Sequence, residues 1–327
     1  MIYFKAQKLW ILLPIILVVS ILVSAKLGSV PISLAEISQI LIGKTTVNYS
    51  VFVNIRLPRI CFSIFSGINL ALAGLILQTV LKNSMADPGI MGISSGAALG
   101  ATLMMLVLPL SVTLVPMVAF CGGMIAFLVI LIFAWERNLS PLRLVLSGVA
   151  VNAIIGGFQA TLMTVYSDKL QGVVTWLNGD LSGKTWEQVG LLTTYSIPII
   201  VLLFMMSKRM NVMNLSDKTI QSLGVNIRQS RLFFSGLAVF LAGVTVSQVG
   251  LISFVGLIVP HIGKLLVGGN MKKLLPCTVL LGGIVMTMAD LIARVVISPL
   301  ELPVGTVMSV LGGPFFLFLL SKQKRGE

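Results

Sequence analysis

The chain has 327 residues, of which 57% are hydrophobic and only 10% are charged, a balance that excludes an ordinary water-soluble domain. Its formal charge of +13 comes from Lys and Arg residues that stand singly or in pairs between apolar runs. Because such a pattern forms no basic stripe that tracks a phosphate backbone, nucleic acid is excluded as a partner and membrane lipid is the expected solvent.

Ten apolar runs, each bounded by charge, Pro or Gly, follow one another along the chain. A spanning helix needs roughly 20 apolar residues, and backbone groups in hydrocarbon must bond within their own segment. The sequence therefore predicts an all-α polytopic membrane protein of about ten transmembrane helices, with residues 1–327 forming a single transmembrane domain. The runs lie approximately at 9–25, 60–81, 92–109, 114–134, 144–166, 189–206, 232–249, 251–263, 274–293 and 303–320.

Two of these runs leave alternatives open. The first ends at Val23-Ser24-Ala25, which is similar to a signal-peptidase site, but its length favours an uncleaved first span. The eighth is short and carries Pro260 and His261 near one end, so a re-entrant or broken helix is the alternative to a complete span.

The bias of Lys and Arg between the runs predicts the orientation. With a cytoplasmic N-terminus, the outer side holds only seven of the 23 cations, namely Lys26, Lys44, Arg56, Arg59, Lys169, Lys184 and Arg294. The inner side holds Lys5, Lys8, Lys82, Arg137, Arg143, Lys208, Arg209, Lys218, Arg228, Arg231, Lys264, Lys272, Lys273, Lys322, Lys324 and Arg325. Both termini are therefore expected in the cytoplasm, with the chain in a bacterial inner membrane.

Small residues recur at the spacing of helix contacts. Gly92, Gly96 and Gly100 form a double small-xxx-small pattern, which predicts close packing of two backbones. Leu72-Ala73-Gly74 in the second run is echoed by Leu241-Ala242-Gly243 in the seventh, which runs the opposite way. The echo hints at an inverted repeat of the kind that transporters use.

Catalytic and metal-site patterns are weak in this chain. Gly43-Lys44-Thr45 and Gly183-Lys184-Thr185 both lack the earlier glycine of a phosphate-binding loop, so no ATPase motif is present. The three cysteines, Cys61, Cys121 and Cys277, lie inside apolar runs and predict neither a disulfide framework nor a metal site.

Ionisable residues inside the runs do not suggest an enzyme either. Asp290 lies four residues before Arg294, which predicts an ion pair on one helix face near the outer surface. We expect no catalysis and no cofactor bound by this chain.

Uncharged polar residues inside the runs are the candidates for a translocation path. In lipid such groups must face other helices or water, so interhelical hydrogen bonding is the alternative for any one of them. A path of this kind suits a bulky chelate, and a secondary carrier or channel for a small solute is the alternative function. The candidates are Asn69, Gln78, Asn152, Gln159 and Gln248.

From Arg56 onward the sequence resembles the permease family that imports iron–siderophore complexes, haem and cobalamin, known as FecCD-type and similar to the vitamin B12 importer permease. Where that family usually has Asn-Pro-Leu-Ala, Ser84 and Met85 depart from the pattern. The matching stretches are Arg56-Leu57-Pro58-Arg59, Gly67, Leu72-Ala73-Gly74, Gln78, the run from Asn83 to Gly92, Trp176-Leu177-Asn178-Gly179, Leu223-Gly224, the run from Phe254 to His261, Leu275-Pro276, Ala289-Asp290, Arg294, the run from Glu301 to Gly305, and Gly312-Gly313-Pro314.

The resemblance implies a set of partners. It implies a second permease copy or a paralogue, an extracytoplasmic substrate-binding protein, and two cytoplasmic ATPase subunits that bind the ATP and Mg. It also implies a cargo, with a ferric siderophore favoured over haem and cobalamin.

The resemblance further implies three contact sites on this chain. Arg56, Arg59 and Arg294 match the arginines that dock the binding protein. A cytoplasmic segment at about 208–231 would couple to the ATPase through a short helix over 215–226, with Leu215, Ser216, Asp217, Leu223 and Gly224 as its contact, cap and stop residues. The cytoplasmic gate would be formed by Asn83, Met85, Pro141 and Leu142, although the apolar last pair departs from the small hydroxylated residues usual in cobalamin importers.

Overall fold

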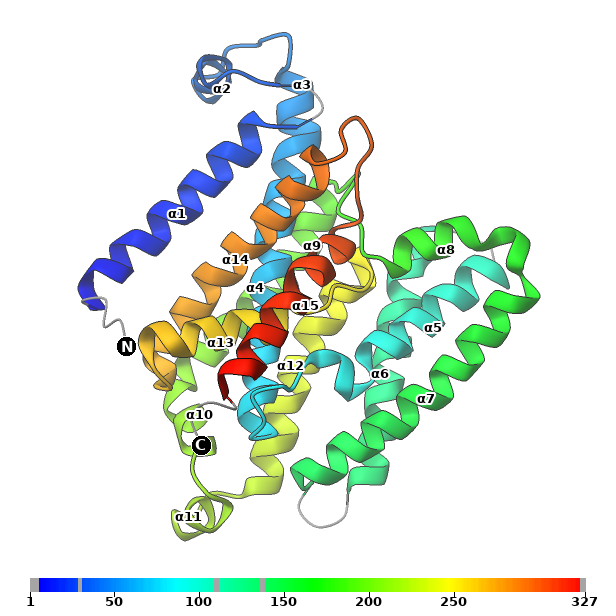
Figure 1. Cartoon of the computed structure of the whole chain (residues 1–327), viewed down its shortest axis with the longest axis vertical. Coiled ribbons are helices and arrows are strands. Elements are labelled where there is room, and N and C mark those ends of the chain that lie inside the picture. Colours follow the sequence, from blue (N-terminus) through cyan, green and yellow to red (C-terminus); the bar gives the residue numbers. More distant parts are fainter. Residues whose placement is uncertain (1–5, 29–30, 109–111, 136–138, 324–327) are drawn as a thin grey trace.

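The computed structural model describes residues 6–28, 31–108, 112–135 and 139–323. Within these residues all regular secondary structure is helical, and the long helices form one bundle in which some run along the long axis and others lie oblique to it (Figure 1). Lys5, Arg137, Lys324 and Arg325 of the orientation pattern lie outside the described residues.

Each of the ten apolar runs forms one helix, which confirms the all-α polytopic prediction. Seven of these helices are long and apolar enough to cross a membrane, whereas α5, α13 and the described apolar part of α15 are shorter. The ten are α1 (Ala6–Lys26), α4 (Leu57–Val80), α5 (Ile93–Leu106), α6 (Val115–Ala134), α7 (Pro141–Val165), α9 (Trp186–Met205), α12 (Ile227–Val249), α13 (Val255–Val267), α14 (Met271–Val295) and α15 (Val304–Gln323).

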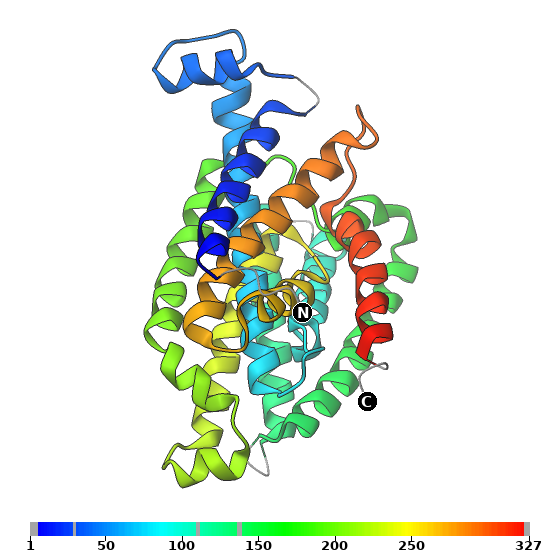
Figure 2. The same ribbon diagram turned by 60° about the vertical axis from the view of Figure 1, so that its left-hand side comes forward.

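Short helices fill the connections between the long ones. They are α2 (Leu34–Leu41), α3 (Tyr49–Val51), η1 (Phe52–Arg56), η2 (Pro88–Met91), η3 (Val112–Leu114), η4 (Ser167–Lys169), α8 (Leu170–Leu177), α10 (Ser207–Met213) and α11 (Asp217–Ser222). In Figures 1 and 2, α2 lies at the top and α8 on the upper right-hand side, and α10 and α11 lie at the bottom. The side of the bundle with α2 and α8 is here called the α8 end, and the opposite side the α11 end.

Helix α4 is the centre of the fold. Every residue from Ser66 to Val80 is buried, because α9, α12, α13 and α14 pack around it. A helix that is apolar on all sides is stable only when it is enclosed in this way. Helices α4 and α12, which carry the two Leu-Ala-Gly triplets, run in opposite directions (Figure 1).

Glycine pairs allow the closest helix contacts. A Cβ on Gly96 would lie 2.3 Å from the Gly122 carbonyl oxygen, which confirms that the predicted small-residue pattern packs α5 against α6. The same kind of seam joins α4 to α14, where a Cβ on Gly67 would lie 2.1 Å from the Gly282 carbonyl oxygen.

Helix α13 is a half-length helix, as the broken-helix alternative predicts. Its 13 residues rise about 20 Å, less than the roughly 30 Å of a hydrocarbon core. The residues from Gly250 to Phe254 are not helical, and their backbone is covered by protein: a Cβ on Gly250 would lie against the carbonyl oxygen of Trp176, and one on Gly305 would lie 2.6 Å from the carbonyl oxygen of Leu251. Irregular backbone at membrane depth is tolerated where it is buried in protein.

Candidate functional site

An ion network lies near the α8 end, between α4, α14 and the segment before α15. Arg59 Nε donates to Asp290 Oδ1 at 2.8 Å, and Arg59 Nη1 pairs with Glu301 Oε2 at 2.7 Å. Arg294 Nε lies 3.1 Å from Asp290 Oδ2, so the ion pair predicted from their spacing is confirmed. Asp290 is fully buried, and its charge is compensated by two guanidinium groups.

The network extends to the end of α1 through a backbone carbonyl and a serine hydroxyl. Arg56 Nη1 donates to the Ala25 carbonyl oxygen at 2.8 Å, and Arg294 Nη2 donates to Ser24 Oγ at 2.5 Å. The three arginines proposed for docking are 5%, 7% and 5% exposed for Arg56, Arg59 and Arg294. Their guanidinium groups therefore hold the end of α1 against η1, α4 and α14, and little of each arginine is exposed.

Helix α11, at the α11 end, is a short helix with a defined N-cap and a defined C-terminal stop. Ser216 Oγ accepts from the Thr219 backbone N–H at 3.2 Å, and Gly224 has a left-handed φ of 73°, so the predicted cap and stop are confirmed. The helix runs only over Asp217–Ser222, and the prediction of a helix over 215–226 was too long. Leu215 precedes the cap and Leu223 closes the helix, because the left-handed turn at Gly224 diverts the chain toward α12.

Asp217 ties α11 to the rest of the chain. Its Oδ1 lies 2.6 Å from Lys82 Nζ, in the loop that follows α4, and its Oδ2 lies 2.9 Å from Arg231 Nη2 on α12. Partial burial by itself raises the pKa of Asp217, but the hydrogen bonds from Lys82 and Arg231 outweigh burial and lower that pKa below its ordinary value. The carboxylate is therefore ionised at neutral pH and bridges three segments.

The four residues proposed for a gate lie on two segments near the same end. Asn83 Oδ1 accepts from the Met85 backbone N–H at 2.9 Å in the loop after α4. Pro141 and Leu142 begin α7, and the side chains of Met85 and Leu142 are 39% and 69% exposed. The two segments are connected through η2, which directly follows the loop and packs on α7.

Two of the polar residues proposed for a path make hydrogen bonds between helices. Asn69 Nδ2 donates to Ser196 Oγ at 2.6 Å and to Thr245 Oγ1 at 3.1 Å, which joins α4 to α9 and α12. Gln78 Nε2 donates to the Gly256 carbonyl oxygen at 3.2 Å, and Gln78 Oε1 accepts from Lys264 Nζ at 2.9 Å. Both side chains are buried, which is the alternative that the sequence leaves open.

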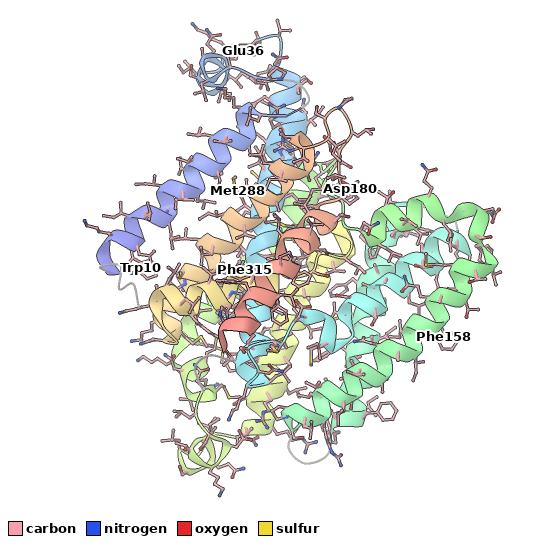
Figure 3. The ribbon with its side chains drawn as sticks, in the orientation of Figure 1. Trp10, Glu36, Phe158, Asp180, Met288 and Phe315 are labelled. Carbon is pink, nitrogen blue, oxygen red and sulfur yellow. The ribbon has the colours of Figure 1, made fainter. Side chains whose placement is uncertain are left out.

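The other three polar candidates lie in different surroundings. Asn152 on α7 accepts from Ser95 Oγ at 2.6 Å. Gln159, further along α7, is half-buried beside Phe158, which Figure 3 shows pointing away from the molecule. Gln248 lines a cavity between α6, α9 and α12. The five candidates therefore do not share one surface of the described chain.

Lys184 is a buried cation whose contacts the sequence does not indicate. Its Nζ donates to the Gln248 carbonyl oxygen at 2.6 Å and lies 5.5 Å from the centre of the Phe62 ring. Burial lowers the pKa of Lys184 to about 8, although the nearby Asp180 carboxylate acts in the opposite direction. In the sequence Lys184 is visible only as part of Gly183-Lys184-Thr185, an incomplete phosphate-loop motif, which does not indicate these contacts.

The fold and these sites define a class: a multi-pass helical membrane protein with an ion network at one end, a capped surface helix at the other, and a broken helix between them. The model of the FecCD transport family matches residues 16–322, and the chain therefore belongs to this family. Membership makes the chain a transport protein, as the resemblance implied.

Individual relatives are similar over their whole length. The Fe(3+)-citrate import system permease protein YfmE of Bacillus subtilis is 35% identical over 318 residues, which cover 97% of this chain and 96% of that protein. A Staphylococcus aureus protein named "Probable heme-iron transport system permease protein IsdF" is 32% identical over 323 residues, covering 99% of this chain and 98% of that protein.

Solved structures agree with the fold. A structure described as "An inward-facing conformation of a putative metal-chelate type ABC transporter" superposes with a TM-score of 0.85 at 28% identity, covering 97% of this chain and 99% of that one. PsaBC from Streptococcus pneumoniae has a TM-score of 0.59 at 16% identity, which is similarity of fold alone.

Proposed function

We propose that this chain is the membrane-spanning permease subunit of an ABC importer for an iron chelate. In this proposal the residues from 1 to 327 act as one transmembrane domain, and both termini lie in the cytoplasm. The α8 end faces outward, and a separate pair of ATPase subunits binds ATP and Mg at the α11 end. The observation that carries the proposal is the three-way link that Asp217 makes between α11, the loop after α4, and α12.

The link at Asp217 supports a coupling role because it connects a surface helix to the proposed gate. A subunit that pushed on α11 would act through Lys82 on the loop that holds Asn83 and Met85. The half-exposed Asp217 carboxylate lies against the buried Arg231 guanidinium, so movement of α11 would also act on α12. Leu215, Ser216 and Leu223 are exposed around this helix and form its proposed contact surface.

The proposed docking surface at the α8 end depends on the same arginines that build the ion network. Glu301 is its most accessible acid, with a side chain 34% exposed, and it shares Arg59 with the buried Asp290. A carboxylate from a binding protein would therefore compete with Glu301 for Arg59, while Arg56 and Arg294 add positive charge beside it.

The exposed face of α7 supports a second permease subunit, either another copy or a paralogue. Apolar side chains on this helix are largely exposed, including Leu146 at 58%, Val149 at 59%, Ile154 at 61% and Phe158 at 63%. The half-buried Gln159 lies seven residues after Asn152 and four after Ile155, so it belongs to the inward-packing side of α7 and not to this exposed face. We place the translocation path along α7, between the two subunits.

The proposed cargo is a ferric chelate, because the similar proteins YfmE and IsdF are named for Fe(3+)-citrate and heme-iron. The test is uptake by cells that lack the gene, supplied in turn with iron-labelled ferric citrate, a ferric siderophore or haem. We expect loss of uptake of at least one of these chelates and its restoration by the wild-type gene. Unchanged uptake of all three would contradict the proposal.

A further inference from the structure

A cavity of about 660 Å³ opens between α6, α9 and α12, away from the proposed path along α7. This volume is in the range of small-molecule sites. Each of the three helices contributes the part that is nearest the α8 end: the start of α6, the start of α9 and the end of α12. The cavity is therefore confined to one half of the membrane-spanning region.

The lining changes from polar to apolar along the helices. Glu187 and Gln188 lie in the first turn of α9, and Gln248 lies in the last turn of α12. Deeper along α9 the lining residue is Tyr195, which is seven residues or about 10 Å below Gln188. Tyr195 meets Phe240 at a ring-centroid distance of 6.2 Å, and Phe120 meets Phe240 at 5.6 Å, so aromatic rings form the floor.

The mouth of the cavity opens onto an apolar surface. On α6, Met117 and Ile125 are 66% and 60% exposed, and on α9, Leu191 and Val201 are 46% and 52% exposed. Because the second permease subunit is placed on α7, the exposed stripes of α6 and α9 are left to face hydrocarbon. A ligand that enters here therefore comes from the lipid phase.

The polar rim favours a cation that carries N–H donors. Glu187 supplies a carboxylate, and Gln248 Oε1 is a buried acceptor to which no described residue donates a hydrogen bond. Buried acceptors in proteins are nearly always satisfied, so this atom indicates a donor from a ligand. The Lys184 amino group donates to the backbone carbonyl of Gln248 and makes no hydrogen bond to this side-chain oxygen.

From the rim, the floor and the mouth together, we infer that this cavity binds one phospholipid with an ethanolamine headgroup; its place in the outer leaflet rests on the orientation proposed above. The acyl chain lies on the aromatic floor, and the ammonium group donates to Glu187 and Gln248 at the rim. Glu187 also stabilises α9, because a negative charge at a helix N-terminus interacts favourably with the helix dipole. Its effect on lipid selection therefore has to be separated from its effect on the stability of the protein.

The first test is native mass spectrometry of the full chain released from nanodiscs that contain equal amounts of phosphatidylethanolamine and phosphatidylglycerol. We expect one retained phospholipid per chain, enriched in phosphatidylethanolamine. Leu191→Trp and Met117→Trp fill the mouth from α9 and α6, and each should reduce retention by about tenfold. Val201→Trp is the matched control, because it is exposed on the same helix but lies outside the cavity lining.

The second test concerns the headgroup. Glu187→Gln and Gln248→Leu should still retain a lipid but lose the preference for phosphatidylethanolamine, and thermal unfolding of each variant separates this effect from helix stability. Phosphatidylcholine, which has the cation but no N–H donor, should be retained less than phosphatidylethanolamine. Three results would overturn the inference. The first is equal retention of lipid in wild type and both mouth variants, and the second is displacement of the lipid by a ferric chelate. The third is a headgroup preference that neither rim substitution changes.

Discussion

The contact between α4 and α13 is close enough to give a quantitative prediction for Gly74→Ala. A Cβ on Gly74 would lie 1.9 Å from the Gly256 carbonyl oxygen, whereas ordinary contact begins at 3.4 Å. The two backbones would have to separate by the difference, 1.5 Å. Overpacking of this kind costs about 1–3 kcal/mol or more, and the helix propensity of alanine offsets at most about 1 kcal/mol.

The hydrogen bonds of Gln78 increase this cost, because they cross the same seam to the carbonyl oxygens of Gly256 and Leu257 at 3.2 and 3.3 Å. We therefore expect Gly74→Ala to lower the free energy of unfolding by about 2 kcal/mol or more. The assay is thermal unfolding of the purified chain in detergent, followed by intrinsic tryptophan fluorescence.

The matched control for this prediction is Gly236→Ala on α12, where nothing lies within 4 Å of the added Cβ. Because a glycine inside a helix is replaced without a clash, the control should be neutral or slightly stabilising. If Gly74→Ala unfolds at the same temperature as Gly236→Ala, the packing argument for α4 and α13 is wrong.

Three further predictions address the two ends of the chain. Asp290→Asn removes the carboxylate shared by two buried guanidinium groups, so it should lower the free energy of unfolding by about 3–5 kcal/mol, and an unchanged unfolding temperature would contradict the network. The pKa of Asp217 is lowered from its ordinary 3.8, so its contribution to the docking of α11 should be fully present at neutral pH and be lost progressively below about pH 5. Hydrogen exchange in α11, corrected for intrinsic pH dependence, should show constant protection between pH 7 and about 5 in wild type and reduced protection throughout this range in Asp217→Asn. Arg56→Glu should weaken capture of the binding protein and reduce its salt dependence, and undiminished capture by a folded variant would remove Arg56 from the proposed docking surface.

The sequence predicts where the helices lie but not which residues far apart in the chain contact one another. Hydrophobic run length is a local property, so all ten helices could be placed, and the cap at Ser216 and the stop at Gly224 were also visible in the local pattern. The salt bridge from Arg59 to Asp290 joins residues 231 positions apart, and no spacing rule reaches that far. Local periodicity predicts the Asp290–Arg294 pair, but it does not predict that Arg59 joins the same network.

Backbone contacts in the structure explain the Trp176–Gly179 motif, for which the chemistry of its side chains suggests no role. The stretch from Trp176 to Gly179 resembles its family without an evident chemical role in the sequence. In the structure a Cβ on Gly179 would lie 2.5 Å from the Leu251 carbonyl oxygen, and one on Gly305 would lie 2.3 Å from the Asn178 carbonyl oxygen. The motif packs backbone against backbone beside the non-helical start of α13, a role that depends on residues far away in the chain.

The most direct test of the proposed importer is uptake of an iron-labelled ferric chelate into proteoliposomes that contain this chain. The liposomes hold ATP and Mg inside, with or without the ATPase subunits, and the loaded binding protein is added outside. The account predicts uptake only when the ATPase, ATP and the binding protein are all present, and no ATP hydrolysis by this chain alone. Uptake that proceeds without the ATPase, driven by an ion gradient, would contradict it.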